Sequence, residues 1–552
     1  MRRLLLPLVL LATSARGVAQ TPRPYTHADT LRGSYTSPGR AWWDVSFYDL
    51  HVAVNPADSS IRGHNAITYR VTGPGATLQI DLMTPLEVDS MLQAGRRATY
   101  RRDGNAFFVT PTVPARPGDV QTLTVYYHGR PQIAKRPPWE GGFSWSTDSL
   151  GRPWVVTTDQ GMGASVWWPN KDTQADEPDS QRVVITVPDS LIDVSNGRLR
   201  SVRRQADGAT SYEWFVTNPV NNYAIAVAAG RYTHFSDLYR GEGGLLTLDF
   251  WPLDYHLDAA KRQFAQVKPM LQCFEHWFGP YPWYEDGYKL IEVSNNGMEH
   301  QSAVAYGNGY ANGYQRRDMS GTGLGLEWDF IIVHESAHEW WGNNITTKDI
   351  ADMWVHESFA TYAEGLYTEC RFGKAKGAAY LIGLRRNIRN DRPVVPDAYG
   401  VNAQGSGDMY PKGAQMLHMI RQLVGDDEKW RSILRGLNQT FRHQTVTGAQ
   451  VQQYLAQQTG LDLSKIFEQY LRTTRVPVLE YRLQGRTLSY RWADAVPGFD
   501  LPLPVTIGGV ERTLRPTPRW QSLRLPKSPT GPLTVDPDFY VTARDVAAAA
   551  AR

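Results

Sequence analysis

The sequence predicts a multidomain α+β protein of 552 residues. Short β-branched segments bounded by turn-forming residues fill the first part of the chain, which predicts an all-β domain. Apolar residues at helical spacing dominate the middle, and strand patterns return near residue 476. With 41% hydrophobic and 11% aromatic residues, the chain has the composition of a globular protein large enough for roughly two to four domains.

Residues 1–19 predict a secretory signal peptide. Arg2-Arg3 form a charged start, Leu4 to Ala12 an apolar stretch, and Gly17-Val18-Ala19 a cleavage site. The apolar stretch is too short to span a bilayer, which argues against the alternative of a membrane anchor. We therefore expect an exported protein, secreted or periplasmic, without an integral membrane segment after signal removal. Residues 20–40, rich in Thr, Arg and Pro, are expected to form a leader.

Residues 20–255 are predicted to form the N-terminal all-β domain. Its strand signals are short and lie between Gly, Pro, Asn and Asp residues. The expected strands are Phe47–Val54, Ala66–Val71, Leu78–Leu82, Leu123–Tyr127, Arg182–Val187 and Tyr223–Ala228.

Residues 256–475 are predicted to form a mainly helical domain. Its first helix should run from Leu257 to Phe278 and end at Gly279-Pro280. Leu290–Val293 is expected to be an edge strand that leads into a turn at Gly297-Met298-Glu299.

Residues 476–552 predict a small β-sandwich with a frayed tail from Ala547. Its strands should be Val478–Leu483, Thr487–Trp492 and Leu501–Ile507.

The chain has two cysteines, Cys273 and Cys370. Their spacing alone does not show whether they pair. They could pair in an oxidising compartment, but two cysteines in so long a chain do not make a disulfide scaffold, so we expect unpaired thiols over a disulfide.

The segment His334-Glu335-Ser336-Ala337-His338 predicts a catalytic metal site. Histidines four apart lie on one face of a helix and can bind one Zn²⁺, and Glu357 on a second predicted helix can be the third ligand. The fourth position is then open to water, from which Glu335 can take a proton. The alternative is an amphipathic helix with two surface histidines. Apolar flanks, Phe330–Val333 and Trp340-Trp341, argue instead that both imidazoles are buried and need a partner.

Two further carboxylates are candidates to hold the metal-binding histidines in place. Zinc-bound imidazoles commonly donate their second N–H to a carboxylate or a carbonyl. Glu364 shares a helix face with Glu357, and Asp352 precedes the same helix. Asp352 could alternatively be an ordinary helix-start carboxylate.

Four motifs appear in the same order as in one known family. They are Gln160 ahead of Pro169-Asn-Lys-Asp172, Gly297-Met298-Glu299-His300, the zinc motif with Glu357, and Tyr410-Pro411-Lys412-Gly413. Through them the chain resembles the aminopeptidase N and leukotriene hydrolase family of zinc metallopeptidases, the gluzincin aminopeptidases. The resemblance implies an N-terminal β-saddle domain, a thermolysin-like catalytic domain and one zinc ion per chain.

The resemblance also implies roles for individual residues. Tyr410 would stabilise the oxyanion through its phenolic O–H. Glu299, next to Gly297 and Met298 in the substrate site, would bind the substrate ammonium, and Gln160 would add a neutral acceptor from the β domain.

The chain departs from the family in three respects. His300 replaces the usual Asn, and Ser358 replaces the usual Gly after the third ligand. The long helical C-terminal domain of many members is missing, so a carboxylate-binding arginine from that domain cannot be assigned here.

The sequence thus predicts a zinc-dependent aminopeptidase acting on peptides with a free N-terminus. An endopeptidase or an epoxide hydrolase on the same site is one alternative, and a catalytically silent secreted binding protein is another. Glu299 favours N-terminal recognition, and the presence of Glu335 and Tyr410 argues against a silent protein. The formal charge is only +3, and without a long basic run nucleic-acid binding has no support.

Overall fold

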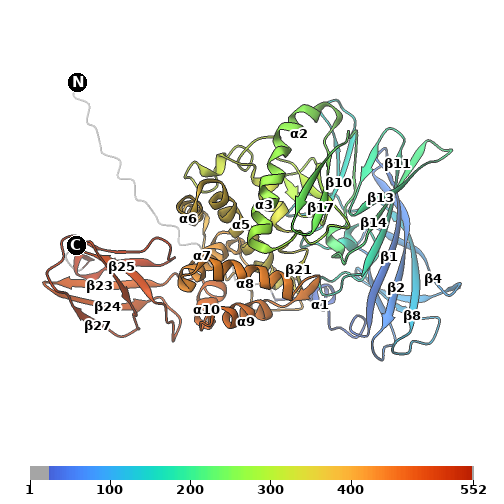
Figure 1. Cartoon of the computed structure of the whole chain (residues 1–552). Helices are drawn as coiled ribbons and strands as arrows, with labels where there is room; N and C mark the ends of the chain where they lie inside the picture. The colour runs from blue at the N-terminus through green and yellow to red at the C-terminus, as the bar shows by residue number, and fades with distance from the viewer. Residues whose placement is uncertain (1–23, 550–552) are drawn as a thin grey trace, which may run out of the picture.

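The computed structural model describes residues 24–549, which form three regions in chain order (Figure 1). A β-rich region lies at one end, a mainly helical region in the middle, and a smaller β region at the other end. The predicted multidomain α+β fold class is confirmed. The predicted signal peptide, residues 1–19, lies outside the described residues.

The N-terminal region is built on an eight-stranded sheet in the order β13-β14-β11-β1-β2-β8-β4-β5. Its strands are β1 (Trp43–Asn55), β2 (Ser60–Val71), β4 (Glu87–Gln93), β5 (Arg96–Arg97), β8 (Val120–Gly129), β11 (Ser180–Pro188), β13 (Arg198–Arg204) and β14 (Ala209–Val216). From Tyr48 to Val54 in β1 every second side chain, including Tyr48, Leu50 and Val52, is buried. This alternation arises because successive side chains of a strand point to opposite faces.

Two smaller sheets complete this region, in the orders β12-β15-β10-β9 and β3-β7-β6. Their strands are β3 (Leu78–Asp81), β6 (Thr99–Asp103), β7 (Ala106–Thr110), β9 (Gly142–Thr147), β10 (Pro153–Thr158), β12 (Ile192–Val194) and β15 (Ala228–Gly230). The strand predicted at Tyr223–Ala228 is wrong, because Asn222–Ala224 form a 3₁₀ turn before β15. A short, fully buried apolar run has no periodicity that separates these possibilities.

Residues 24–40 are part of the fold, so the predicted leader is wrong for them. Helix α1 (His27–Gly33) starts with a capping box between Thr26 and Asp29. Beyond it, the fully buried side chain of Arg40 lies 2.5 Å from the carboxylate of Asp81.

The helical region contains a five-stranded sheet in the order β16-β17-β18-β20-β19. Its strands are β16 (Phe235–Gly241), β17 (Gly244–Trp251), β18 (Tyr288–Glu292), β19 (Gly297–Met298) and β20 (Val304–Tyr306). The prediction of an edge strand at Leu290–Val293 is wrong, because β18 is parallel to β17 on one side and β20 on the other. The edge is β19. Two strands of this sheet, β16 and β17, precede the predicted domain boundary at residue 255.

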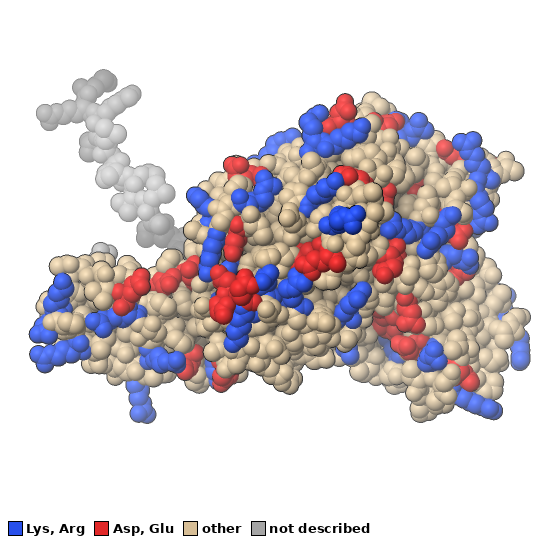
Figure 2. All heavy atoms as spheres, viewed as in Figure 1, with Lys and Arg blue, Asp and Glu red and all other residues tan. Residues whose placement is uncertain are grey.

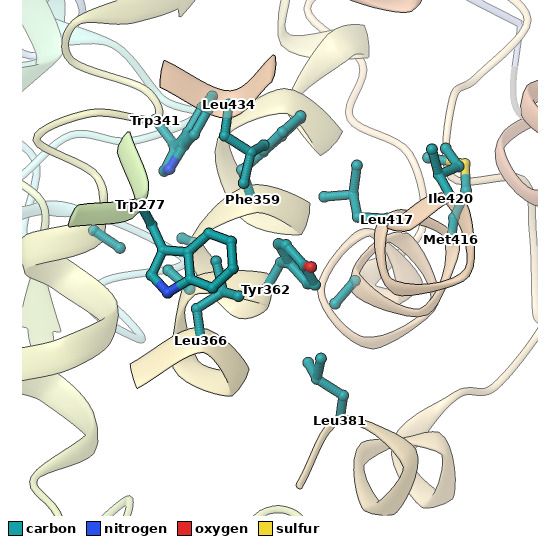
Figure 3. Close-up of a cluster of buried hydrophobic side chains, with 14 of the residues drawn as sticks. Trp277, Trp341, Phe359, Tyr362, Leu366, Leu381, Met416, Leu417, Ile420 and Leu434 are labelled. Atoms are coloured by element: carbon teal, nitrogen blue, oxygen red, sulfur yellow. The ribbon is translucent and has the colours of Figure 1, made fainter. Parts of the chain in front are cut away.

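The helices pack around α5, whose residues 354–368 are all buried. They are α2 (Leu257–Gln263), α3 (Val267–Phe278), α4 (Phe330–Ala337), α5 (Trp354–Phe372), α6 (Lys374–Gly383), α7 (Pro411–Val424), α8 (Asp427–Thr440), α9 (Gly448–Thr459) and α10 (Ser464–Arg472). Figure 3 shows Trp277, Phe359, Leu417 and Leu434, from four different helices, within one apolar cluster. The helix predicted from Leu257 to Phe278 is interrupted by a 3₁₀ turn at Phe264–Gln266. A pair of short strands, β21 (Ile345–Thr347) and β22 (Gln444–Val446), also lies in this region.

Cys273 and Cys370 form a disulfide, so the expectation of unpaired thiols is wrong. Cys273 lies on α3 and Cys370 near the end of α5. The packing of these helices brings the two Cα atoms to 6.1 Å, although 97 residues separate them in sequence. This distance is within the range that a disulfide bridges.

The C-terminal region consists of two sheets in the orders β27-β24-β23-β29 and β26-β25-β28, in agreement with the expected β-sandwich. The strands are β23 (Val478–Gln484), β24 (Thr487–Ala493), β25 (Leu503–Ile507), β26 (Val510–Leu514), β27 (Gln521–Arg524), β28 (Leu533–Val535) and β29 (Thr542–Asp545). The tail expected to fray from Ala547 begins instead in a short helix, α11 (Val546–Ala549).

Acidic and basic side chains are interspersed over the face shown in Figure 2. Among the described residues, no helix combines the length and apolar character needed to cross a bilayer.

Candidate metal centre and active site

Helix α4 presents the two histidines of the zinc motif. It starts at Asp329, whose carboxylate accepts hydrogen bonds from the N–H groups of Ile331 and Ile332. His334 and His338 are 5% and 1% exposed, so the prediction that they are buried is confirmed. Regular helix ends at Ala337, earlier than the apolar run through Trp341 predicted.

The side chains of His334, His338 and Glu357 converge on one point. Their possible ligand atoms all lie within 4.8 Å of one another. The Nε2 atoms of His334 and His338 are 3.6 and 3.4 Å from Oε2 of Glu357. That oxygen is buried and has no hydrogen-bond partner among the described residues. A buried carboxylate oxygen without a donor is costly, and a metal ion removes that cost.

The outer nitrogens of both imidazoles are already engaged. Nδ1 of His334 lies 2.7 Å from Oε1 of Glu364, and Nδ1 of His338 lies 2.8 Å from the carbonyl oxygen of Trp341. If each Nδ1 donates to its oxygen, each Nε2 keeps its lone pair for the metal. Tyr380 donates to the other oxygen of Glu364 at 2.6 Å and helps to hold that carboxylate in place. The donor set therefore fits zinc.

The structure places Asp352 elsewhere, so the prediction that it is a partner of a zinc-binding histidine is wrong. Its carboxylate accepts a hydrogen bond from the N–H of Gly448 at 2.8 Å and from the hydroxyl of Tyr399 at 2.9 Å. Asp352 belongs to a 3₁₀ turn before α5 and connects it to the start of α9.

Glu335 and Glu299 face the same space as the donor set. Glu299, Glu335 and His338 form a second group that could hold a cation, and their possible ligand atoms also lie within 4.8 Å of one another. Burial raises the pKa of Glu335, and the carboxylates of Glu357 and Glu364 add to this effect. Burial also raises the pKa of Glu299, to about 7. A proton or an organic cation is therefore favoured at these carboxylates.

Gln160 joins the two larger regions at this site. It follows β10 in the N-terminal region, and its side-chain amide donates to Glu299 at 2.5 Å and to Glu357 at 3.0 Å. Tyr223 lies on the same side, with its hydroxyl 3.4 Å from Glu299. Tyr223 was not predicted as a site residue, because it was assigned to a strand and no motif marks it.

Tyr410 borders the donor set from the start of α7. Its ring stacks against the ring of His334, with centroids 5.9 Å apart. Burial raises the pKa of Tyr410, with help from the charges of Glu357 and Glu299, so the phenol keeps its proton. Ser358, one of the departures from the family pattern, donates to the carbonyl oxygen of Met409 at 2.7 Å and so contacts the residue before Tyr410.

Comparisons with known proteins agree with this geometry. Residues 262–470 match the model of the peptidase family M1 domain. The chain carries a peptidase family M1 domain. The chain is 28% identical over 251 residues to aminopeptidase N of Lactobacillus helveticus, covering 41% of this chain and 27% of the relative. It is 24% identical over 311 residues to aminopeptidase B of Homo sapiens, covering 53% and 44%. It thus matches less than half the length of either relative.

Solved structures with the M1 fold cover more of the chain. A crystal structure of an M1 zinc metallopeptidase from Deinococcus radiodurans aligns with a TM-score of 0.67 and 22% identity, covering 80% of this chain and 98% of that chain. A mutant of that enzyme, with one glutamate replaced by alanine and a Tyr-Ser-Ala substrate bound, aligns equally well at 21% identity. The likeness shows a shared fold.

The M1 domain implies one zinc ion, which confirms the predicted cofactor, and His334, His338 and Glu357 form a group that could hold it. The cavity beside it has a volume of about 430 Å³. Gln160, Gly297, Glu299, Glu335 and Tyr410 all line it. Met298 is buried next to Gly297 on β19.

Several other residues that line the cavity carry no motif and were missed by sequence reasoning. They include apolar and aromatic residues (Pro138, Trp139, Tyr314, Met319, Leu384) and charged and polar ones (Asn296, Asn387, Arg389, Asp391, Asp408). His300 does not line the cavity. It is 3% exposed, and burial lowers its pKa to about 3, so its ring is neutral.

Proposed function

We propose that the protein is a zinc-dependent aminopeptidase that removes N-terminal residues from peptides. One observation carries the proposal. Glu299, beside the amide of Gln160, lies close enough to the donor set for a substrate to be held by its ammonium while its first peptide bond reaches the metal. Relatives that share the M1 domain carry the names aminopeptidase N and aminopeptidase B, which supports this reading.

Two side chains of the protein, Glu335 and Tyr410, carry out the chemistry. The zinc ion, when bound, supplies a Lewis acid that polarises the scissile carbonyl and lowers the pKa of water. Glu335 accepts a proton from the attacking water as the oxygen bonds to the carbonyl carbon. Tyr410 donates its hydrogen bond to the oxygen that becomes negative. Glu335 then delivers the proton to the leaving amine as the C–N bond breaks, so its carboxylate is restored.

In this proposal Glu299 determines that the enzyme cleaves at the free N-terminus of a peptide and not within the chain. A buried carboxylate gains much from a cation, and a free peptide N-terminus supplies one at a set distance from the first peptide bond. Gln160 holds one oxygen of Glu299 and thereby limits where the ammonium can bind. An N-acetyl group removes the charge and adds bulk at this place.

Turnover of matched free and N-acetylated aminoacyl and peptide substrates tests the proposal, with and without a chelator and with zinc restored. We expect cleavage of free substrates, loss of activity on chelation, and little action on acetylated ones. Glu299→Ala should reduce turnover of free substrates far more than any residual action on blocked peptides. Equal cleavage of free and acetylated peptides by the wild type would favour an endopeptidase instead.

We further propose that the protein acts after export, secreted or in a periplasm. The disulfide between Cys273 and Cys370 supports this location, because disulfides persist mainly in oxidising compartments. Fractionation of cells that express the full chain, with N-terminal sequencing of the product, tests both export and cleavage after residue 19.

A further inference from the structure

Helix α1 lies where the N-terminal β region meets the helical region (Figure 1). Its last residue, Gly33, packs so closely on the helical region that a Cβ there would lie 2.2 Å from the backbone nitrogen of Asn402. The preceding residue, Arg32, points toward the β region, and its side chain is 18% exposed. The helix thus contacts both regions through neighbouring residues.

The guanidinium of Arg32 holds the loop that follows Gln160. Its Nε and Nη2 groups donate to the carbonyl oxygen of Met162 at 3.1 and 2.6 Å. Its Nη1 donates to the carbonyl oxygen of Asp172 at 2.7 Å and lies 3.3 Å from the carboxylate of the same residue. Arg32 therefore connects Met162, at the start of this segment of the β region, to Asp172 ten residues later.

Gly163 shows how closely Arg32 approaches this loop. The residue has a φ of +91°, and a Cβ there would lie 1.8 Å from Nη2 of Arg32. Only glycine combines this backbone conformation with room for the guanidinium. The loop is shaped around Arg32.

The helical region holds the same loop from the other side. Asn402 donates its side-chain amide to the carbonyl oxygen of Gly161 at 3.2 Å. Gly400, two residues earlier, donates its N–H to Asp349 at 2.6 Å, in the 3₁₀ turn that precedes α5. The Gln160–Gly163 loop is therefore clamped between α1 and the segment that leads into the helix of Glu357.

We infer that Arg32 is a positioning residue for substrate binding. By fixing the carbonyl of Met162, it holds the Gln160–Gly163 loop so that the amide of Gln160 stays on Glu299 and Glu357. Without Arg32 the carbonyl of Met162 loses both of its guanidinium donors. The loop then keeps its turn bonds to Asp159 and the bond from Asn402, and Gln160 is held less firmly where it limits the position of a substrate ammonium. This inference deepens the proposed aminopeptidase function and rests on it.

Arg32→Ala in the full chain is the first test. We expect KM for free N-terminal peptides to rise about tenfold with a smaller change in kcat, because ground-state binding of the N-terminus is what weakens. Arg32→Lys should recover part of the loss, since an ammonium can reach only some of these carbonyls. His27→Ala, on the same helix with a side chain 72% exposed, is the matched control and should leave KM unchanged.

A double-mutant cycle separates positioning from a structural role. If Arg32 acts through Gln160, then adding Arg32→Ala to Gln160→Ala should raise KM by little more than Gln160→Ala alone. Multiplicative effects of the two substitutions, or an unchanged KM with a lowered Tm in Arg32→Ala, would overturn the inference.

Hydrogen exchange gives a readout that does not depend on turnover. The amides of Met162 and Gly163, which bond to Asp159 at 3.1 and 2.7 Å, should exchange faster in Arg32→Ala than in the wild type or His27→Ala. Unchanged exchange would contradict the inference even in an active enzyme. Faster exchange in a protein that cleaves no peptide would instead contradict the proposed function and leave the role of Arg32 in shaping the loop intact.

Discussion

The side-chain amide of Gln160 lies 2.5 Å from Oε1 of Glu299, although the two residues belong to different regions of the chain. Gln160 follows β10, and Glu299 follows the edge strand β19. Each of the two sheets ends beside the zinc ligands, so the substrate site lies at the junction of the two regions. If the packing of these two regions changes, the positions of Gln160 and Glu299 relative to each other change as well.

The first prediction concerns the metal. His338→Ala removes one of the ligands, so zinc content should fall from about one per chain to near none after dialysis against a weak chelator. Metal analysis of the purified proteins measures this. His128→Ala, which alters a half-exposed histidine on β8, should retain zinc. Equal zinc in the wild type and His338→Ala would exclude the assigned site.

The second prediction concerns proton transfer. Glu335→Gln keeps the size of the side chain but cannot accept a proton, so kcat should fall by a factor on the order of 10² or more. Zinc should remain, because Glu335 is not a ligand in the assigned set. Steady-state kinetics and metal analysis on the same preparation check both points. Near-wild-type kcat would move the general base elsewhere.

The third prediction concerns the oxyanion. Tyr410→Phe keeps the ring that stacks on His334 and removes only the O–H. We expect kcat to fall by roughly 10²-fold while KM changes little, since this hydrogen bond strengthens in the transition state. A variant that loses zinc or unfolds would point to a structural role for the phenol, and thermal melting distinguishes that outcome.

The fourth prediction separates Glu364 from Asp352, the two carboxylates that the sequence offers as candidate partners of the histidines, with Asp352 the less favoured. Glu364→Gln weakens the partner of His334, and zinc affinity should drop by about 10- to 100-fold. Asp352→Asn is the comparison, because Asp352 contacts Gly448 and Tyr399 instead. Competition with a fluorescent chelator should show weaker zinc binding only in Glu364→Gln. The same loss in both variants would contradict the geometry.

The fifth prediction concerns the disulfide. Replacing Cys273 and Cys370 together by Ser should lower the free energy of unfolding by about 2–4 kcal/mol, because the closed loop no longer restricts the unfolded chain. Thermal melts of the wild type with and without a reductant should show the same loss, and the double variant should no longer respond to the reductant. Activity at low temperature should persist, since neither cysteine lines the cavity.

The sequence alone was enough to predict the burial and shared helix face of His334 and His338, the three-part α+β order and several strands of the N-terminal region, among them β1, β2, β3, β8 and β11. Helical spacing places His334 and His338 on one face wherever the helix packs, and alternation marks strands such as β1 with one buried face. Both signals are local, so they do not depend on the rest of the fold.

Only the tertiary structure decided the features that join distant segments. Four features bring together residues that no periodic pattern in the sequence connects. They are the disulfide, the contact of Gln160 with Glu299, the central position of β18 in its sheet and the packing of α1. For the same reason the sequence could not exclude Asp352 as a partner of a histidine, although it favoured Glu364. The sequence shows that a residue carries a carboxylate, but the partner of that carboxylate depends on which segment packs against it.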